Sequence, residues 1–243
     1  MLDNNGECQC MVADMGVHDR LQPQQVENHR QSLATAPLVI MDCNVPFETM
    51  EHTLDICLEH RVPVWLEPTD VSNADRMFQR GSKWRSSLSY ASPNLNELKV
   101  MYSAILGQHP PPTSGSALED LLTYTGYLGK PLLTGNFHTL LVTLGCHGVV
   151  LVTTLTVDCL FPIRGSEISK GEVRVVHYPA PNVEGIISVS GAGDCFAAGM
   201  ITGILQRLSP SKCIEAGKRA AALSLHSHLA VPQTMCPEMV LPS

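Results

Sequence analysis

The sequence of 243 residues has no long run of basic residues, and its formal net charge is −7. A surface for nucleic acid or for an anionic membrane is therefore not expected. No two of its nine cysteines have the CxxC spacing of common metal and redox motifs, and no signal peptide follows Met1. The chain is therefore predicted to be cytoplasmic, with thiols that stay reduced.

Zinc motifs of standard spacing are also missing. The residue types that bind zinc gather near the end of the chain, at Cys213, His226, His228 and Cys236, but their spacing matches no known finger.

Charged residues are absent from residues 139–157, a length close to that of a membrane helix. Threonine and valine dominate this stretch, and Gly145-Cys146-His147-Gly148 interrupts it. Two buried β-strands joined by a tight turn fit this composition better than a helix. With 44% hydrophobic residues, the chain can bury the core of one domain, or of two at most.

Short apolar segments alternate with segments of helical spacing along most of the chain. Strands are predicted at residues 7–14, 37–42, 62–66, 87–91 and 172–178, with two more inside 139–157. Helices are predicted at residues 23–33, 47–60, 97–106, 118–128, 194–208 and 212–226. Residues 107–117 are rich in proline and serine and are predicted to form a mobile loop. This alternation favours an α/β fold with a mostly parallel sheet and helices on both faces.

Polar residues stand where several of the predicted strands end. They are Asp42 with Asn44, Glu67, Asn94, Thr143 and Asp194. Ligands of open α/β sheets bind beyond the carboxyl ends of the strands, so these residues are expected to lie on one side.

The stretch SVSGAGDCFAAG, residues 188–199, places three small residues before an acid and an apolar helix. Glycines let a ligand approach the backbone, and the start of a helix offers free N–H groups, so the stretch predicts an anion cradle. No Lys-Ser/Thr pair follows the glycines, which excludes a Walker A loop. Phe196 occupies the third glycine position of the Rossmann fingerprint, which excludes that motif too.

Asp194 admits two interpretations. It could accept a proton from a hydroxyl nucleophile while the amides stabilise charge on a transferring phosphoryl group. Alternatively, Ser190 or Asp194 could simply cap the helix, because both residue types are favoured there.

Three motifs together resemble the ribokinase-like, pfkB-type carbohydrate kinases. GAGDCF resembles the signature D-T-x-G-A-G-D-x-F, SPNLNE at residues 92–97 resembles P-N-x-x-E, and TLGCHG at residues 143–148 resembles T-x-G-x-x-G. Within the family, MDCNVPFETM and PVWLEPTDVSNADR are most similar to pseudouridine kinases. The resemblance covers nearly all of residues 1–243, which it identifies as a partial kinase domain.

The resemblance implies transfer of the ATP γ-phosphoryl group to the 5′-hydroxyl of pseudouridine. Asp194 would be the general base, and the amides of Gly191, Ala192 and Gly193 would form the anion hole. Such a reaction needs positioning and charge stabilisation, with no covalent intermediate.

The other two motifs imply a site for Mg·ATP. Asn94 and Glu97 would act on Mg²⁺ and its waters, while Thr143, Gly145 and Gly148 would line the nucleotide site. Each has a simpler interpretation, since Asn94 with Glu97 three residues later is also a helix capping box. The two glycines could serve only a turn between strands.

The sequence departs from the family pattern at two places. Ser188 replaces the first Asp of the signature, an acid that helps to form a monovalent-cation site in relatives, so potassium activation is not predicted. The glycine-rich first strand and the small β lid of the family have no counterpart before Glu7. We therefore expect a shortened form, with weak or no activity alone and an exposed sheet edge.

Several functions and partners stay open. The rival activities are a kinase for ribose or another nucleoside, a non-catalytic nucleotide-binding or regulatory homologue, and an interaction domain without a nucleotide site. Besides a small nucleoside or sugar substrate, the resemblance implies a pseudouridine-phosphate glycosidase as partner, because animals carry the two domains fused. An open sheet edge would also suit a homo-oligomer.

Overall fold

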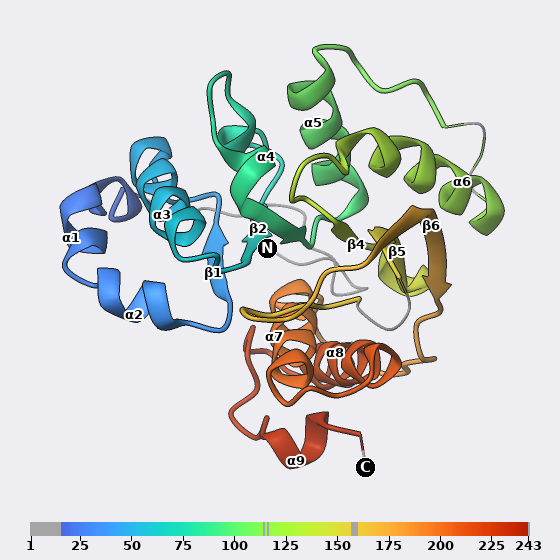
Figure 1. Cartoon of the computed structure of the whole chain (residues 1–243). Helices are drawn as coiled ribbons and strands as arrows, with labels where there is room; N and C mark the ends of the chain where they lie inside the picture. Colours follow the sequence, from blue (N-terminus) through green and yellow to red (C-terminus); the bar gives the residue numbers. More distant parts are fainter. Residues whose placement is uncertain (1–15, 114, 116, 157–159, 243) are drawn as a thin grey trace. The chain divides into compact units, whose positions relative to one another are not determined.

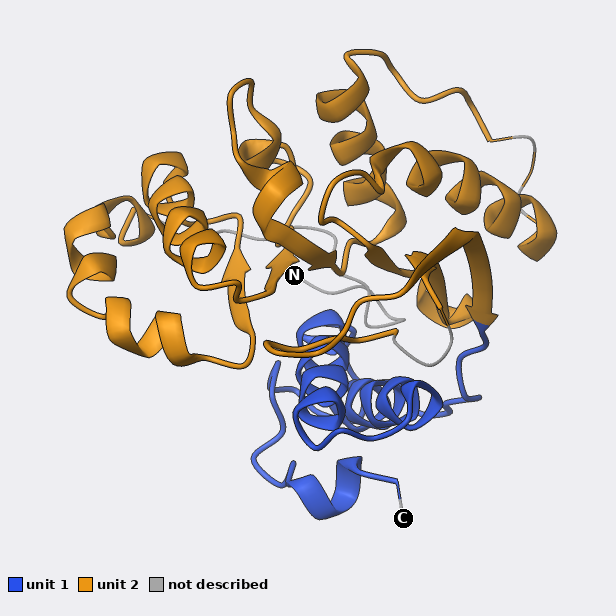
Figure 2. Cartoon of the chain, in the orientation of Figure 1, with its two compact units in different colours: residues 1–13, 178–243 blue, residues 14–177 orange. Residues whose placement is uncertain are grey.

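The computed structural model describes residues 16–113, 115, 117–156 and 160–242, so the strand predicted at residues 7–14 lies outside the described residues. The chain forms two compact units, coloured separately in Figure 2. We call residues 14–177 the sheet unit, and residues 1–13 with 178–243 the helical unit.

Among its described residues, the sheet unit contains six strands, which neighbour one another in the order β1-β2-β3-β4-β5-β6 (Figure 1). Their bounds are β1 Val39–Asp42, β2 Val64–Glu67, β3 Leu88–Ala91, β4 Thr139–Thr143, β5 Val149–Leu155 and β6 Lys170–Tyr178. Strands β1 to β4 are parallel, whereas β5 runs antiparallel to β4 with Leu141 opposite Leu151. The mostly parallel sheet and the hairpin within residues 139–157 are confirmed.

Three long helices connect the parallel strands: α3 Phe47–Glu59, α5 Leu95–Leu106 and α6 Leu118–Gly129. Each was predicted to within a few residues. The helix predicted at residues 23–33 is instead two short helices, α1 Pro23–Glu27 and α2 Arg30–Thr35, and α4 Trp84–Ser87 was not predicted. The few apolar positions of residues 23–33 provide no continuous stripe to hold one helix on the core.

Alternate residues of the strands face the helices. Val39 and Met41 of β1 are buried in a core that also contains Met50 and Leu54 of α3, whereas Ile40 between them is 55% exposed. Burying a side chain such as Leu54 contributes about 2 kcal/mol to folding. The period of two therefore fixes which face of β1 packs on the helices.

The helical unit contains α7 Ala192–Leu205, α8 Pro210–Leu225 and the short α9 Pro237–Val240. Helices α7 and α8 pack so closely that a Cβ atom on Gly199 would lie 2.6 Å from the carbonyl oxygen of Ala216. Helix α7 begins at Ala192, two residues before the predicted start. Among the described residues, no helix is long and apolar enough to cross a membrane.

The described cysteines are all free thiols. Cys43 and Cys57 are fully buried, and burial raises the pKa of each thiol to about 12. These two thiols are therefore protonated at neutral pH and act as small apolar side chains.

Candidate active site

Two of the predicted site residues meet where β3 and β4 end. The Thr143 amide donates to the Pro93 carbonyl at 3.0 Å, and Asn94 forms a parallel bridge with Thr143. The parallel ladder thus continues one step beyond the strands. It places the start of α5 beside the end of β4, at the edge where ligands of such sheets bind.

Asn94 and Glu97 form the capping box of α5. Asn94 Oδ1 accepts the amide hydrogens of Asn96 at 2.9 Å and Glu97 at 3.0 Å, and Glu97 Oε2 accepts the Asn94 amide hydrogen at 2.7 Å. Asn94 is exposed, whereas Glu97 is only 5% exposed. The capping interpretation is therefore confirmed.

The motif TLGCHG ends β4 in a tight turn with one 3₁₀ segment, Gly145–His147. The Leu144 amide donates to the Gly148 carbonyl at 2.8 Å, and the Gly148 amide donates to the Gly145 carbonyl at 3.0 Å. Gly148 has φ 92° and ψ −138°, a conformation that essentially only glycine adopts. Gly145 and Gly148 thus serve the turn, whether or not a nucleotide also binds there.

The side chain of His177 on β6 supports this turn. Its Nε2 lies 2.6 Å from the carbonyl oxygen of His147 and donates to it. A Cβ atom added at Gly145 would meet no atom within 4 Å, so the outer side of the turn has room for a ligand.

The small residues before Asp194 form the start of α7 in the helical unit. Gly191 is the N-cap, with φ 80°, and a Cβ atom there would lie 2.2 Å from the carbonyl oxygen of Ala230. A left-handed residue so close to another backbone must be glycine. Ala230 had no predicted role, because its contact with Gly191 spans 39 residues and leaves no local signal.

The amides of the predicted anion hole differ from one another. The Ala192 amide donates to the Val189 carbonyl at 3.2 Å, whereas the Gly191 and Gly193 amides donate to no described residue. A Cβ atom on Gly193 would also meet nothing within 4 Å. The first turn of α7 therefore offers two amide donors and open space, which suits an anion.

Asp194 is exposed and is the third residue of α7, rather than the first. Ser188, which replaces the acid of the family signature, is 3% exposed, and its Oγ accepts the Ser190 amide hydrogen at 3.1 Å. Ser188 therefore stabilises the loop that leads into the cradle.

The predicted residues thus fall into two groups, one in each unit. Asn94, Glu97, Thr143, Gly145 and Gly148 are in the sheet unit, whereas Gly191, Ala192, Gly193 and Asp194 are in the helical unit.

One polar chain at the carboxyl ends of the strands was not predicted. Trp65 Nε1 donates to Ser92 Oγ at 2.7 Å, and Ser92 Oγ donates to Glu67 Oε2 at 2.6 Å. From the sequence, Glu67 was predicted only to lie at the end of a strand. Its partner Ser92 directly follows β3, 25 residues further along the chain, and local patterns do not relate the two residues.

The model of the pfkB family of carbohydrate kinases matches residues 1–234. This chain belongs to that family.

Two curated relatives carry the same name. The chain is 25% identical over 260 residues to the "Pseudouridine kinase" of Arabidopsis thaliana, covering 95% of this chain and 68% of the relative. It is 24% identical over 200 residues to the "Pseudouridine kinase" of Escherichia coli K12, covering 82% of this chain and 52% of the relative. The chain thus spans between half and about two thirds of these relatives.

Solved structures of the same fold include two ribokinases. That of Thermotoga maritima matches with a TM-score of 0.66 and 19% identity over 98% of this chain and 66% of its own. That of Arabidopsis thaliana, complexed with ribose and ATP, matches with a TM-score of 0.61 and 19% identity over 88% of this chain and 57% of its own. The predicted ribokinase-like α/β fold is confirmed.

Proposed function

We propose that this chain is an ATP-dependent kinase that transfers the γ-phosphoryl group to the 5′-hydroxyl of pseudouridine. The observation that carries the proposal is the start of α7, where a left-handed Gly191, two available amides and Asp194 occupy consecutive positions. Support for the acceptor comes from the two relatives named pseudouridine kinase, one of them matched over 95% of this chain.

In the proposed reaction, Asp194 accepts the proton of the 5′-hydroxyl while the hydroxyl oxygen attacks the γ-phosphorus. The bond from that phosphorus to the β-phosphate oxygen breaks, and ADP leaves. The amides of Gly191 and Gly193 donate to oxygens of the transferring group. The Ala192 amide joins them by giving up its 3.2 Å bond to Val189.

The turn at residues 143–148 is proposed to hold the nucleotide. Its backbone is fixed by its own hydrogen bonds and by His177, and the space outside Gly145 is open. A rigid turn with exposed backbone groups can bind the nucleotide with little loss of conformational entropy.

Asn94 and Glu97 fit Mg²⁺ that is held through water. Their Oδ1 and Oε2 atoms already accept amide hydrogens, and no described group of three or more His, Cys, Asp or Glu side chains is placed to hold a metal. Mg²⁺ commonly keeps several waters and binds substrate phosphates, so an all-protein cage is not required. When bound, it would neutralise part of the phosphate charge.

The test is product formation from pseudouridine, uridine and ribose with Mg·ATP, using the purified chain and its Asp194→Asn variant. We expect slow formation of phosphorylated pseudouridine by the wild type, and a rate lower again by about 10³-fold in the variant, since it lacks the proton acceptor. ATP binding by both forms is the control for folding.

Each contrary result selects a different function. Faster turnover of ribose or uridine would assign another sugar or nucleoside kinase. ATP binding by both forms without any product would assign a non-catalytic nucleotide-binding protein. Equal rates in both forms would remove Asp194 from the reaction.

A further inference from the structure

The motif PVWLEPTDVSNADR continues from β2 into a turn at residues 69–76 that is built around Asp70. Asp70 Oδ1 accepts the Ser72 amide hydrogen at 2.7 Å, the Ser72 hydroxyl at 2.5 Å and the Asn73 amide hydrogen at 3.1 Å. Thr69 has φ 73°, an uncommon conformation for a β-branched residue. Strained backbone of this kind persists where the surrounding bonds hold it, and it is frequent near functional sites.

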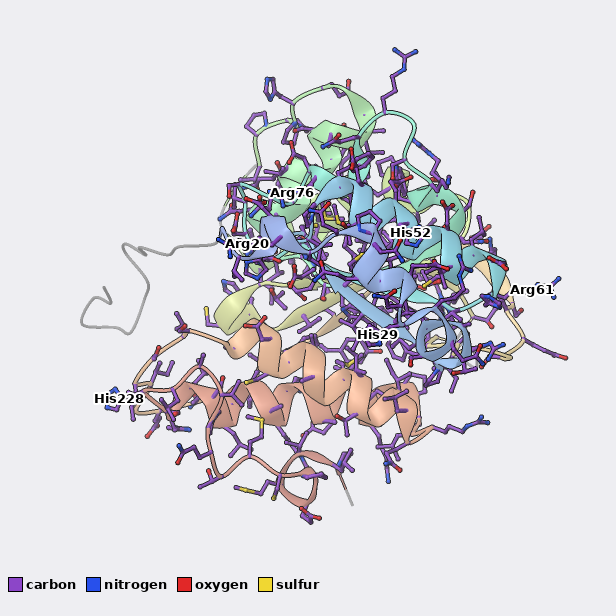
Figure 3. The ribbon with its side chains drawn as sticks, turned by 90° about the vertical axis from the view of Figure 1, so that its left-hand side faces the viewer. Arg20, His29, His52, Arg61, Arg76 and His228 are labelled. Carbon is purple, nitrogen blue, oxygen red and sulfur yellow. The ribbon has the colours of Figure 1, made fainter. Side chains whose placement is uncertain are left out.

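This turn presents two side chains to the loop that follows β1. Arg76, labelled in Figure 3, donates from Nη1 to the Asn44 carbonyl at 2.8 Å and from Nη2 to Asn73 Oδ1 at 2.7 Å. Asn73 Nδ2 in turn donates to Asn44 Oδ1 at 3.2 Å. The two motifs that most resemble pseudouridine kinases, 32 residues apart at these positions, therefore meet in one hydrogen-bonded cluster.

The loop after β1 is held from its other side as well. The Cys43 amide donates to the Glu67 carbonyl at 3.0 Å, and Asp42 Oδ1 accepts the Asn44 amide hydrogen at 2.8 Å. Asn44 is only 7% exposed. These hydrogen bonds hold the loop from both sides. It lies at the carboxyl ends of β1 and β2, where ligands of parallel sheets bind.

We propose that Arg76 is a positioning residue for the acceptor nucleoside, because it ties the loop of residues 42–46 to the turn of residues 69–76. This inference rests on the proposed function. Arg76 forms no ion pair with any described residue, so its planar guanidinium serves as a hydrogen-bonding bridge between carbonyl and amide oxygens. A lysine has the same charge but lacks this fork of donors.

The experiment compares the wild-type full chain with Arg76→Ala and Arg76→Lys. Arg80→Ala is the matched control, because Arg80 is exposed and makes no hydrogen bond or ion pair with a described residue. For Arg76→Ala we expect KM for pseudouridine to rise about tenfold while KM for ATP stays within about twofold. Arg76→Lys should restore little, and Arg80→Ala should match the wild type.

Amide hydrogen exchange provides a readout that does not depend on turnover. Residues 42–46 should exchange faster in Arg76→Ala than in the wild type, with no such change in β4. Unchanged exchange in this loop, or an equal rise of both KM values, overturns the proposal.

Failure of the proposed function is distinguishable from failure of this inference. If the wild type binds pseudouridine in a thermal-shift assay but forms no product, only the kinase proposal fails. The positioning role is then decided by whether Arg76→Ala weakens that shift. If the wild type neither binds nor phosphorylates pseudouridine, the positioning role for this acceptor is overturned as well.

Discussion

The predicted site residues of the sheet unit and those of the helical unit are fixed in place by different interactions. In the sheet unit, hydrogen bonds from side chains and strand ends fix Asn94, Glu97 and Thr143. In the helical unit, close packing of the backbone takes the place of such bonds. Gly191 and Gly199 have no side chain, and each lies against another backbone segment. The first arrangement loses stability when a polar group is removed, and the second when a single carbon is added.

Matched glycine substitutions give the strongest test of this difference. Gly191→Ala places a Cβ atom 2.2 Å from the Ala230 carbonyl oxygen and keeps an unfavourable φ of 80°. We expect it to cost about 3 kcal/mol of stability, because overpacking adds to left-handed strain. Gly145→Ala has φ 56° but open space, so it should cost only about 1 kcal/mol.

Urea unfolding of the three proteins, followed by circular dichroism, measures both losses. Equal costs for the two variants would mean that strain alone acts and that the close approach of Ala230 does not matter. Turnover of Gly191→Ala, measured where it remains folded, should fall as well, because the cradle amides shift with Gly191.

Local sequence patterns predicted the features whose partners lie within a few residues. The partners of the capping box, Asn94 and Glu97, are three positions apart, and the glycine turn between β4 and β5 is a local signal too. The alternation of strands and helices along the sequence was sufficient to predict the mostly parallel sheet. The start of α7 was misplaced by two residues because Gly191, in its left-handed conformation, ends the loop earlier than the position of Asp194 suggested.

Features that depend on distant partners could not be predicted. The bridge from Arg76 to Asn44 and the contact of Ala230 with Gly191 each join segments more than 30 residues apart. Nothing in the residue types of either pair indicates its partner, because arginine and alanine occur in many settings. Those contacts follow from strand order and helix packing, and they appear only when the fold is known.

A buried histidine tests whether the two units lose structure separately. His138 of the sheet unit is 2% exposed, and burial, followed by the charge of Lys170, lowers its pKa to about 4. The unfolded chain binds this proton near pH 6.5, so folded-state stability is lost as pH falls from about 6.5 to about 4, by about 2 to 3 kcal/mol in all.

The measurement is the difference between the wild type and His138→Leu in urea unfolding at pH 7 and pH 4.5, which cancels the other histidines. His138→Leu should show the smaller loss on acidification. Hydrogen exchange at pH 4.5 should then rise in β4 and β5 before it rises in α7 and α8. A simultaneous rise in all four elements would show that the units unfold together.

The smallest expected effect separates capping from metal binding at the start of α5. Asn94→Ala removes the acceptor of two amide hydrogens and should cost about 1 kcal/mol of stability. Glu97→Gln keeps an oxygen for the Asn94 amide, so its loss of stability should stay below about 0.5 kcal/mol.

If the pair also acts on Mg²⁺ through water, Glu97→Gln should raise the Mg²⁺ concentration for half-maximal turnover by about tenfold, because outer-shell partners tune metal affinity. An unchanged Mg²⁺ requirement would mean that Glu97 acts only in the helix cap. The sheet unit would then contribute backbone geometry to the binding of Mg²⁺, without the charge of Glu97.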